Sequence, residues 1–237
     1  AGIDSIKDKE PVSGFKNAFG EEFWSYLSKH PEKEALFASA MTSFSQSETA
    51  AILKTWAPTK EDFTFCDVGG GHGFVLATVL EHYPKSNGVL IDLPANAEHA
   101  EALFASRNLT DRATALGGDF FQPLPKEQLA ECDVYFMKHI LHDWNDDASV
   151  KILSNIRESM RPGSKLLNCD FVIGGSSMPS MEKAKHLMDI NMLQACGYGA
   201  KERSVSEFAE LFKNAGFNKE MQLLPLRDLV SLLEVPV

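Results

Sequence analysis

A glycine-rich turn followed by a distant acid is the clearest chemical signal in this sequence. An apolar run that contains Asp67 leads into Gly69–Gly73, where four of the five residues are glycine, and a helical pattern follows. The next apolar run ends in Asp92, nineteen residues after the last of these glycines. Such a turn lets backbone amides approach a ligand, and an acid about 20 residues further on grips the hydroxyls of a ribose. The pattern therefore predicts a cofactor that contains a nucleoside.

The spacing of the glycines argues against a dinucleotide. The dinucleotide fingerprint needs a glycine five residues after its first one, but Phe74 stands five residues after Gly69. Asp67 would repel phosphates at this turn, whereas it suits a cationic cofactor, such as the amino acid end of S-adenosylmethionine. A Walker phosphate loop is excluded because no Gly-Lys-Ser/Thr follows. The alternative that remains is a tight strand–helix turn without a ligand.

Composition restricts the size of the fold and the classes of partner. The chain has 237 residues, of which 44% are apolar, and a formal net charge of -10. This suffices for one sizeable domain, or for one domain with a small appendage. The acidic balance argues against nucleic acid and anionic membranes, and no apolar run reaches the roughly 20 residues of a membrane span. The four cysteines lack metal-ligand spacing, so we expect reduced thiols, no metal site and a cytoplasmic location.

Strand-like and helix-like runs alternate from Phe63 onward. The candidate strands are 63–68, 88–93, 113–117, 134–137 and 165–172, and the candidate helices are 74–82, 96–106, 146–160 and 183–196. This alternation predicts an α/β fold in which a doubly wound, mostly parallel sheet has helices on both faces. Ser204 and Glu207 form a capping-box pattern for one more helix. The last two runs, 217–224 and 229–235, predict an antiparallel hairpin at the sheet edge and bring the sheet to seven strands.

The N-terminal part has a helical pattern. Aromatic and aliphatic residues recur at every fourth position from Phe15 to Leu27, which predicts one helix. Two more helical segments follow, one from about Glu32 and one from Glu48 to Trp56. We therefore divide the chain into an N-terminal helical segment, 1–57, on the substrate side and available as an interface, and a cofactor-binding domain, 58–237.

Six motifs occur in the order expected of a known family. They are Asp67–Gly73, Ile91–Pro94, Gly118–Phe121, Lys138–Trp144, Asp189–Leu193 and Lys201–Arg203. With them the chain resembles, from about Phe15 to its C-terminus, the class I S-adenosylmethionine-dependent O-methyltransferases of the plant caffeic acid and hydroxyindole type. The resemblance implies a Rossmann-like fold, with S-adenosyl-L-methionine as cofactor and S-adenosyl-L-homocysteine as product. It also implies methyl transfer to a hydroxyl of a small aromatic acceptor, in secondary metabolism.

The same resemblance leaves the partners of the chain open. Family members carry a helical N-terminal domain that forms a dimer and closes part of the substrate pocket, and this chain begins where that domain would end. A homodimer or another protein partner through the N-terminal helices is therefore an open expectation. No metal is implied, because a histidine base fills the role that Mg²⁺ has in catechol methyltransferases of the other type.

The resemblance also implies contacts to the cofactor. Asp92 would accept both ribose hydroxyls, and Leu93 would pack on the adenine. Asp119 would reach the adenine amino group, with Phe120 against the ring face. The other implied contacts are Ser45 at the methionine carboxylate, Asp67, Gly69, Gly71 and Lys138.

A histidine is the candidate catalytic group. A phenol has a pKa near 10, so a nearby imidazole that takes its proton would accelerate methyl transfer about 10²–10⁴-fold. His142 follows the fourth predicted strand, at the edge where such sheets bind ligands, and it matches the general base of the family. Asp170 and Glu202 match glutamates that flank this base, although Asp170 is one methylene shorter. The alternative for His142 is a structural role at the start of the next helix, and His139 is interpreted as pocket wall or buried packing.

Four residues match positions of the acceptor pocket in the family: Phe37, Met41, Asn191 and Met192. Core packing is an equally good explanation of these residues, because apolar side chains at helical spacing are usually buried.

Two other functions compete with methyl transfer. The first is a methyltransferase-like binding or structural subunit that no longer methylates, and the second is a different reaction with the same cofactor.

Overall fold

The N-terminal helices of the computed structural model differ from the sequence-based expectation. The model describes residues 12–175, 179–197, 199–226 and 228–237, so the first eleven residues of the predicted helical segment lie outside it. Three helices come first: α1 (Gly14–Phe19), α2 (Phe23–Lys29) and α3 (Pro31–Thr55). The prediction of one helix from Phe15 to Leu27 is wrong, because Gly20 adopts φ 81° and ends α1. Glycine enters this left-handed region at little cost.

The predicted interruption of α3 is also wrong. A single helix of 25 residues begins at Pro31, where a proline suits the first turn. The aromatic rings of the predicted stripe still meet, but they do so across the turn between α1 and α2. The Phe15 ring stacks on Phe19 at 4.4 Å and meets Phe23 edge-on at 5.3 Å, measured between ring centroids.

The predicted α/β sheet is confirmed. Its strands are β1 (Thr64–Val68), β2 (Asn87–Asp92), β3 (Ala113–Gly117), β4 (Val134–Lys138), β5 (Lys165–Ile173), β7 (Gln222–Pro225) and β8 (Val230–Pro236). Their order is β3-β2-β1-β4-β5-β8-β7, with an antiparallel β8 between β5 and β7. An unpredicted two-residue strand, β6 (Arg203–Ser204), pairs with β5 off this path and makes the sheet of the described residues eight-stranded.

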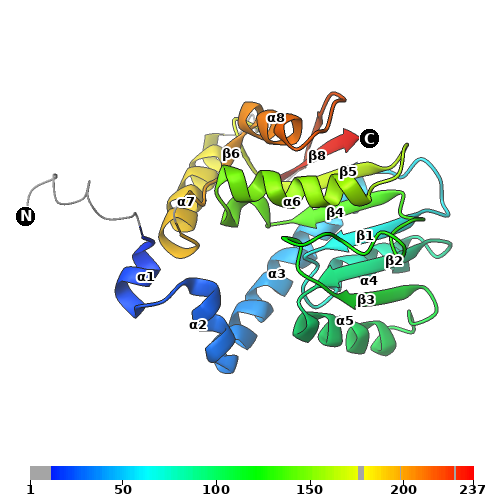
Figure 1. Cartoon of the computed structure of the whole chain (residues 1–237), viewed down its shortest axis with the longest axis horizontal. Helices are drawn as coiled ribbons and strands as arrows, with labels where there is room; N and C mark the ends of the chain where they lie inside the picture. The colour runs from blue at the N-terminus through cyan, green and yellow to red at the C-terminus, as the bar shows by residue number, and fades with distance from the viewer. Residues whose placement is uncertain (1–11, 176–178, 198, 227) are drawn as a thin grey trace, which may run out of the picture.

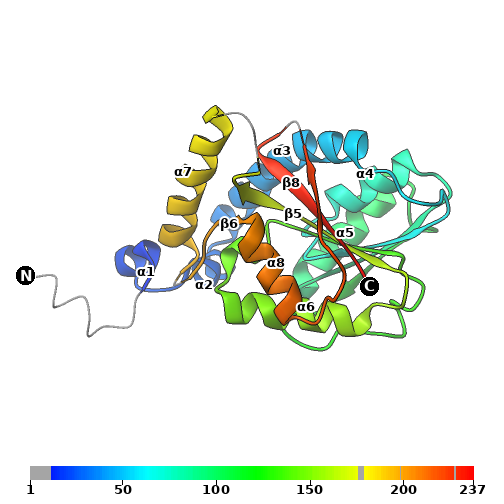
Figure 2. The same ribbon diagram turned by 90° about the horizontal axis from the view of Figure 1, so that it is seen from above.

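Helices cover both faces of the sheet. The helices that follow α3 are α4 (Phe74–His82), α5 (Pro94–Ser106), α6 (Asp146–Ser159), α7 (Pro179–Ala195) and α8 (Val205–Asn214). Figure 2 shows α3 and α4 on one side of the strands and α6 and α8 on the other, with α7 standing apart beside α1. The predicted capping box starts α8, since Ser204 and Glu207 exchange both hydrogen bonds. Within the described ranges, every helix is too short or too polar to cross a lipid bilayer.

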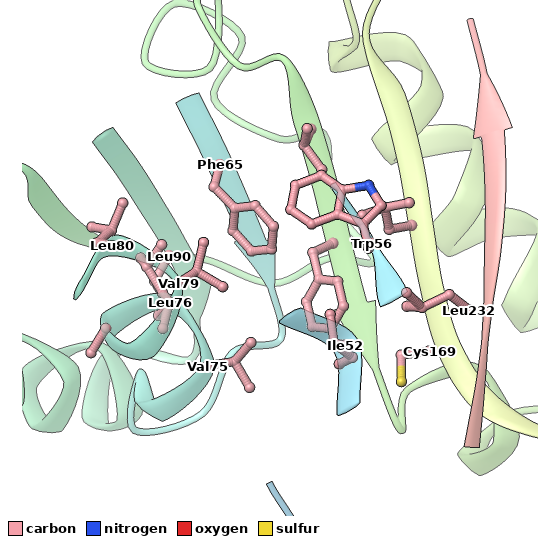
Figure 3. Close-up of a cluster of buried hydrophobic side chains, with 14 of the residues drawn as sticks. Ile52, Trp56, Phe65, Val75, Leu76, Val79, Leu80, Leu90, Cys169 and Leu232 are labelled. Atoms are coloured by element: carbon pink, nitrogen blue, oxygen red, sulfur yellow. The ribbon is translucent and has the colours of Figure 1, made fainter. Parts of the chain in front are cut away.

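Two apolar clusters, one on each face, hold the sheet between its helices. Figure 3 shows the first, where Ile52 and Trp56 from the end of α3 lie near Phe65 of β1 and Val75 of α4. The second cluster packs α6 and α8 on the opposite face. All four cysteines carry free thiols, and three of them are fully buried in the core as small apolar residues.

The carboxyl ends of the parallel strands meet at one edge, and this edge positions the site (Figure 1). The parallel register aligns Val68 of β1 with Ile91 of β2, and Lys138 of β4 with Cys169 of β5. The glycine turn, Asp92 and the segment that follows Lys138 therefore leave the sheet side by side. This is the location at which doubly wound sheets bind ligands.

Candidate active site

His142 lies in a 3-10 turn, η2 (Leu141–Asp143), directly after β4. The residue is buried, with 7% of its surface exposed. Its Nδ1 lies 2.9 Å from Oε1 of Glu202. A carboxylate partner favours the tautomer in which Nδ1 carries the proton. Nε2 is then the nitrogen left to exchange a proton with a ligand.

Two further carboxylates approach the same imidazole. Asp143 Oδ1 lies 3.6 Å from Nε2, and Asp170 Oδ1 lies 3.9 Å from Nδ1 of His142. Burial lowers the pKa of His142, but Asp143, Glu202 and Asp170 raise it by more, to about 10. Burial also raises the pKa of Asp170 to about 7, against the lowering effect of His142. These neighbours therefore hold the imidazole in its charged form until a ligand changes the balance.

The segment that carries Glu202 also fixes the backbone of the turn that carries His142. The Lys201 amide donates to the His142 carbonyl at 3.0 Å. The Arg203 guanidinium, fully buried, donates to the carbonyls of Leu141 at 2.7 Å and Trp144 at 2.8 Å. Because β6 anchors this segment to β5, the imidazole is held from two sides.

His139 belongs to a polar cluster beside His142, which goes beyond the packing role expected for it. Its Nε2 lies 2.8 Å from Glu48 Oε1, while Glu48 Oε2 accepts a hydrogen bond from Lys138 Nζ at 2.9 Å. Burial raises the pKa of Glu48, but His139 and Lys138 lower it by more, to about 2. The rings of His139 and His142 stack with centroids 5.2 Å apart. Nδ1 of His139 lies 3.9 Å from Asp170 Oδ1.

The glycine turn after β1 has the geometry that close backbone approach requires. Gly69 and Gly71 both have positive φ, 71° and 56°. A Cβ on Gly69 would lie 2.6 Å from the Ile140 side chain, whereas a Cβ on Gly71 would meet nothing within 4 Å. Gly71 therefore faces open space, and its amide donates to Asp92 Oδ2 at 2.8 Å. The turn and the acid are held together as a ligand cradle needs them.

Asp67 is buried next to this turn, with 2% of its surface exposed. Its Oδ2 has no hydrogen-bond partner among the described residues. Burial raises the pKa of Asp67 to about 7, although Lys138 lowers it. A buried carboxylate oxygen without a partner is costly, and a ligand that brings a donor or a positive charge would satisfy it.

The other predicted cofactor residues lie around the same edge, with different exposure. Leu93 is 58% exposed at the start of α5. Phe120 lies beside the turn, since a Cβ on Gly69 would come 3.5 Å from its ring. Asp119 is exposed and accepts a hydrogen bond from the Phe121 amide at 2.9 Å. Ser45 is buried on α3, the helix that carries Glu48.

The two acceptor residues predicted on α3 lie near the N-terminal helices. Phe37 and Met41 are both half-buried. The Phe37 ring meets Phe23 and Trp24 of α2 edge-on, at 5.4 and 5.5 Å between centroids. Phe37 is thus part of an aromatic group that joins α2 to α3.

The two acceptor residues predicted on α7 differ in their surroundings. Met192 is buried, and its Sδ lies 4.0 Å from Cys196 Sγ. Cys196 donates to Asp143 Oδ1 at 3.1 Å, so Met192 is joined to His142 through two side chains. Asn191 is exposed and donates to the Met188 sulfur at 3.6 Å. Only Met192 of this pair is connected to the site by these contacts.

Several residues at the site were not predicted from sequence. Asp143 was the easiest to find, because it follows His142 directly in the sequence. Asp189 accepts a hydrogen bond from the Glu202 amide at 2.9 Å, and it belongs to one of the quoted motifs. Glu48 and Cys196 carried no local signal, because their importance comes from how α3 and α7 pack.

Known O-methyltransferases have sequences similar to that of this chain. The chain is 34% identical over 224 residues to the phenazine O-methyltransferase PhzM of Lysobacter antibioticus, covering 94% of this chain and 62% of that protein. It is 36% identical over 215 residues to the mitomycin biosynthesis 6-O-methyltransferase of Streptomyces lavendulae, covering 89% and 57%. The chain thus spans only about three fifths of the length of these relatives.

Solved structures of O-methyltransferases are also similar to this chain. The mitomycin 7-O-methyltransferase MmcR superposes with a TM-score of 0.84 at 35% identity, covering 98% of this chain and 65% of that one. The O-methyltransferase NcsB1, solved with S-adenosyl-L-homocysteine and 1,4-dihydroxy-2-naphthoic acid, superposes with a TM-score of 0.82 at 29% identity, covering 99% and 66%. The family model described as "O-methyltransferase domain" matches residues 3–218. This chain belongs to that O-methyltransferase family.

Proposed function

We propose that this chain transfers a methyl group from S-adenosyl-L-methionine to a hydroxyl of a small aromatic acceptor, with His142 as general base. The observation that carries the proposal is the buried pair of His142 Nδ1 and Glu202 Oε1, 2.9 Å apart, at the ligand-binding edge of the sheet. Relatives named for phenazine and mitomycin, and the naphthoic acid in the NcsB1 structure, support an aromatic acceptor.

The residues at the glycine turn fit this cofactor, which supplies an electrophilic methyl group on a cationic sulfur when bound. Asp92 would accept the ribose hydroxyls with the oxygen that now accepts from the Gly71 amide. The unpartnered oxygen of Asp67 suits the positive charge of the amino acid end. The open space at Gly71 leaves room for the ligand along the backbone. The cofactor of the NcsB1 structure supports the same assignment.

The remaining cofactor contacts are proposed on the family pattern. Leu93, with its exposed side chain, would pack on one face of the adenine, and Phe120 would pack on the other. Asp119 is free at one carboxylate oxygen to accept from the adenine amino group, because the Phe121 amide uses only Oδ1. Lys138 and Ser45 would lie toward the methionine part.

His142 would take the proton of the acceptor hydroxyl at Nε2. Throughout, the Nδ1–H group stays bonded to Glu202, which stabilises the imidazolium that forms. The acceptor hydroxyl would replace Asp143 as the neighbour of Nε2. A cation bound nearby lowers the pKa of an imidazole, so cofactor binding would move His142 toward the neutral form that a base requires. Asp170 adds a second carboxylate beside Nδ1.

The acceptor would lie between α3 and α7. Phe37, Met41 and Met192 provide apolar and thioether surfaces suited to a flat ring, and Asn191 provides a polar group at the edge. Cys196 and Asp143 connect Met192 to the base. The acceptor ring would then lie close enough to His142 for proton transfer from its hydroxyl.

A second candidate is a binding or structural subunit that does not methylate. It is favoured by large apolar side chains exposed on the N-terminal helices and α7: Phe19 at 56%, Phe44 at 48%, Leu187 at 59% and Leu193 at 56%. Exposed apolar surface of this kind marks contact with another molecule. A homodimer or another protein partner on these helices is compatible with both candidates.

A two-stage experiment separates the candidates. The chain is first titrated with S-adenosyl-L-methionine in a calorimeter, with Asp92→Ala as the variant and Asp111→Ala, an exposed acid, as its control. Saturable binding that only Asp92→Ala weakens supports the cofactor site. Phenolic acceptors are then screened by mass spectrometry for the gain of one methyl group. Binding without any methylated product would favour the non-methylating subunit.

A further inference from the structure

Two imidazoles and a buried carboxylate converge at the proposed base, His142, and the mechanism leaves His139 without a role. We propose that His139, His142 and Asp170 bind Zn²⁺ or a similar transition-metal ion, which inhibits the chain and takes no part in methyl transfer. Imidazole and carboxylate donors together are the set that such ions prefer in proteins. This site is distinct from the cofactor cradle at the glycine turn.

The donor atoms already lie close together. One ring nitrogen each of His139 and His142 and a carboxylate oxygen of Asp170 are all within 4.8 Å of one another. Ligands at about 2.0–2.1 Å from a tetrahedral zinc are about 3.4 Å apart. Each imidazole nitrogen lies 3.9 Å from Asp170 Oδ1, so a contraction of about half an ångström would close the shell. A water molecule would supply the fourth donor, as in zinc sites with three protein ligands.

The site also contains buried polar atoms that need a partner. Nδ1 of His139, Oδ1 of Asp170 and Oε2 of Glu202 have no hydrogen-bond partner among the described residues. These side chains are only 9%, 0% and 0% exposed. Buried polar atoms in native structures almost always have a partner, and one cation between His139 and Asp170 would satisfy the first two.

Glu48 fixes the tautomer of His139 that metal binding requires. Its Oε1 lies 2.8 Å from Nε2 of His139, so Nε2–H donates to the carboxylate and Nδ1 keeps its lone pair. Metal-bound histidines almost always have such a carboxylate or carbonyl behind them. The backbone of His139 has φ 55°, a strained value for a side chain of this kind. The bond to Glu48, itself held by Lys138, keeps the ring in place despite that strain.

Metal binding and base catalysis exclude each other at this site. An ion on His142 Nδ1 displaces the proton of this nitrogen to solvent and leaves the remaining proton on Nε2. The charge of Asp143, whose Oδ1 lies 3.6 Å from Nε2, favours a proton on this nitrogen. Nε2 is then no longer able to take a proton from an acceptor hydroxyl. This inhibition rests on the proposed function, whereas the binding of the ion does not.

Metal binding is tested directly on the untagged chain, without cofactor or acceptor. Zn²⁺ is titrated in a calorimeter, and Co²⁺ is titrated while the visible absorption of the four-coordinate ion is recorded. The variant is His139→Asn, because asparagine tolerates the left-handed backbone. The matched control is His99→Asn, which removes an exposed histidine whose ring lies 4.6 Å from that of His72. Thermal unfolding confirms that each variant is folded.

The expected result is one ion per chain in the wild type and in His99→Asn, with affinity at least about tenfold lower in His139→Asn. If His139→Asn fails to fold, Glu48→Gln replaces it, with an expected loss of about 10- to 100-fold. Equal affinity in the wild type and these variants, or loss of binding in His99→Asn, would overturn the proposal. Absence of any binding by the folded wild type would overturn it as well. In methyl-transfer assays, Zn²⁺ should slow the wild type and His99→Asn, and a chelator should restore their rates.

Discussion

Replacing Glu202 by Gln should change the pH at which the proposed base becomes active. Glu202 lies 2.9 Å from Nδ1 of His142 and is one of three carboxylates that raise the pKa of this imidazole to about 10. Loss of one close opposite charge lowers such a pKa by about one to three pH units. This equals about 1.4–4 kcal/mol of lost preference for the charged form. A base acts when it is neutral, so activity rises as the pH rises through this pKa.

The assay is the pH dependence of kcat/KM for the acceptor at saturating cofactor, which reports the ionisation of the enzyme–cofactor complex. The rising limb should move to lower pH by about one to three units in Glu202→Gln. The plateau at high pH should fall by about 10- to 100-fold, because a neutral amide stabilises the imidazolium less well. Glu210→Gln, an exposed change on α8, is the control. An unchanged midpoint in Glu202→Gln would refute the electrostatic argument.

Three further predictions concern the cradle, a buried acid and a helix cap. Asp92→Ala should lower the affinity for S-adenosyl-L-methionine, measured by calorimetry, at least about tenfold, since hydrogen bonds to charged groups contribute about 1.5–3 kcal/mol. Unchanged affinity would contradict the proposed cofactor site at the glycine turn. Between pH 5 and 2, the free energy of unfolding of the wild type should fall by on the order of 3 kcal/mol more than that of Glu48→Gln. The reason is that the pKa of Glu48 is lowered to about 2 in the fold, so that its stabilising effect disappears as the pH falls. Denaturant midpoints of the two proteins that change in parallel over this range would refute it. Ser204→Ala should cost about 1 kcal/mol in urea unfolding through loss of the capping box, with exposed Glu210→Ala on the same helix as a near-neutral control.

The central sheet could be predicted closely from the sequence because its strands are nearly continuous apolar runs. The predicted strand 113–117 coincides with β3, and the helix 74–82 coincides with α4. Strands buried on both faces leave such runs, and glycines or capping residues mark the turns between them. The N-terminal helices were harder to predict, because a stripe at every fourth position continues across Gly20. Only the left-handed backbone of this glycine breaks the helix.

The candidate site could be predicted only in part. Asp92 is the last residue of β2 and His142 follows β4, so their position at the sheet edge can be inferred from the chain order. The pair of Glu48 and His139 joins residues 91 positions apart, through the packing of α3 on the edge of the sheet. The contact of Cys196 with Asp143 likewise depends on where α7 ends. No local pattern encodes these contacts, because each depends on how a helix packs against the completed sheet.

The rate of methyl transfer by His142→Gln tests the central claim most directly. The assay follows methylation of an acceptor found in the mass-spectrometric screen, at saturating S-adenosyl-L-methionine, in the wild type and the variant. The account predicts a fall in rate of about 10²–10⁴-fold, with cofactor affinity and thermal stability close to those of the wild type. Methyl transfer by His142→Gln at the wild-type rate would contradict the role of His142 as the base.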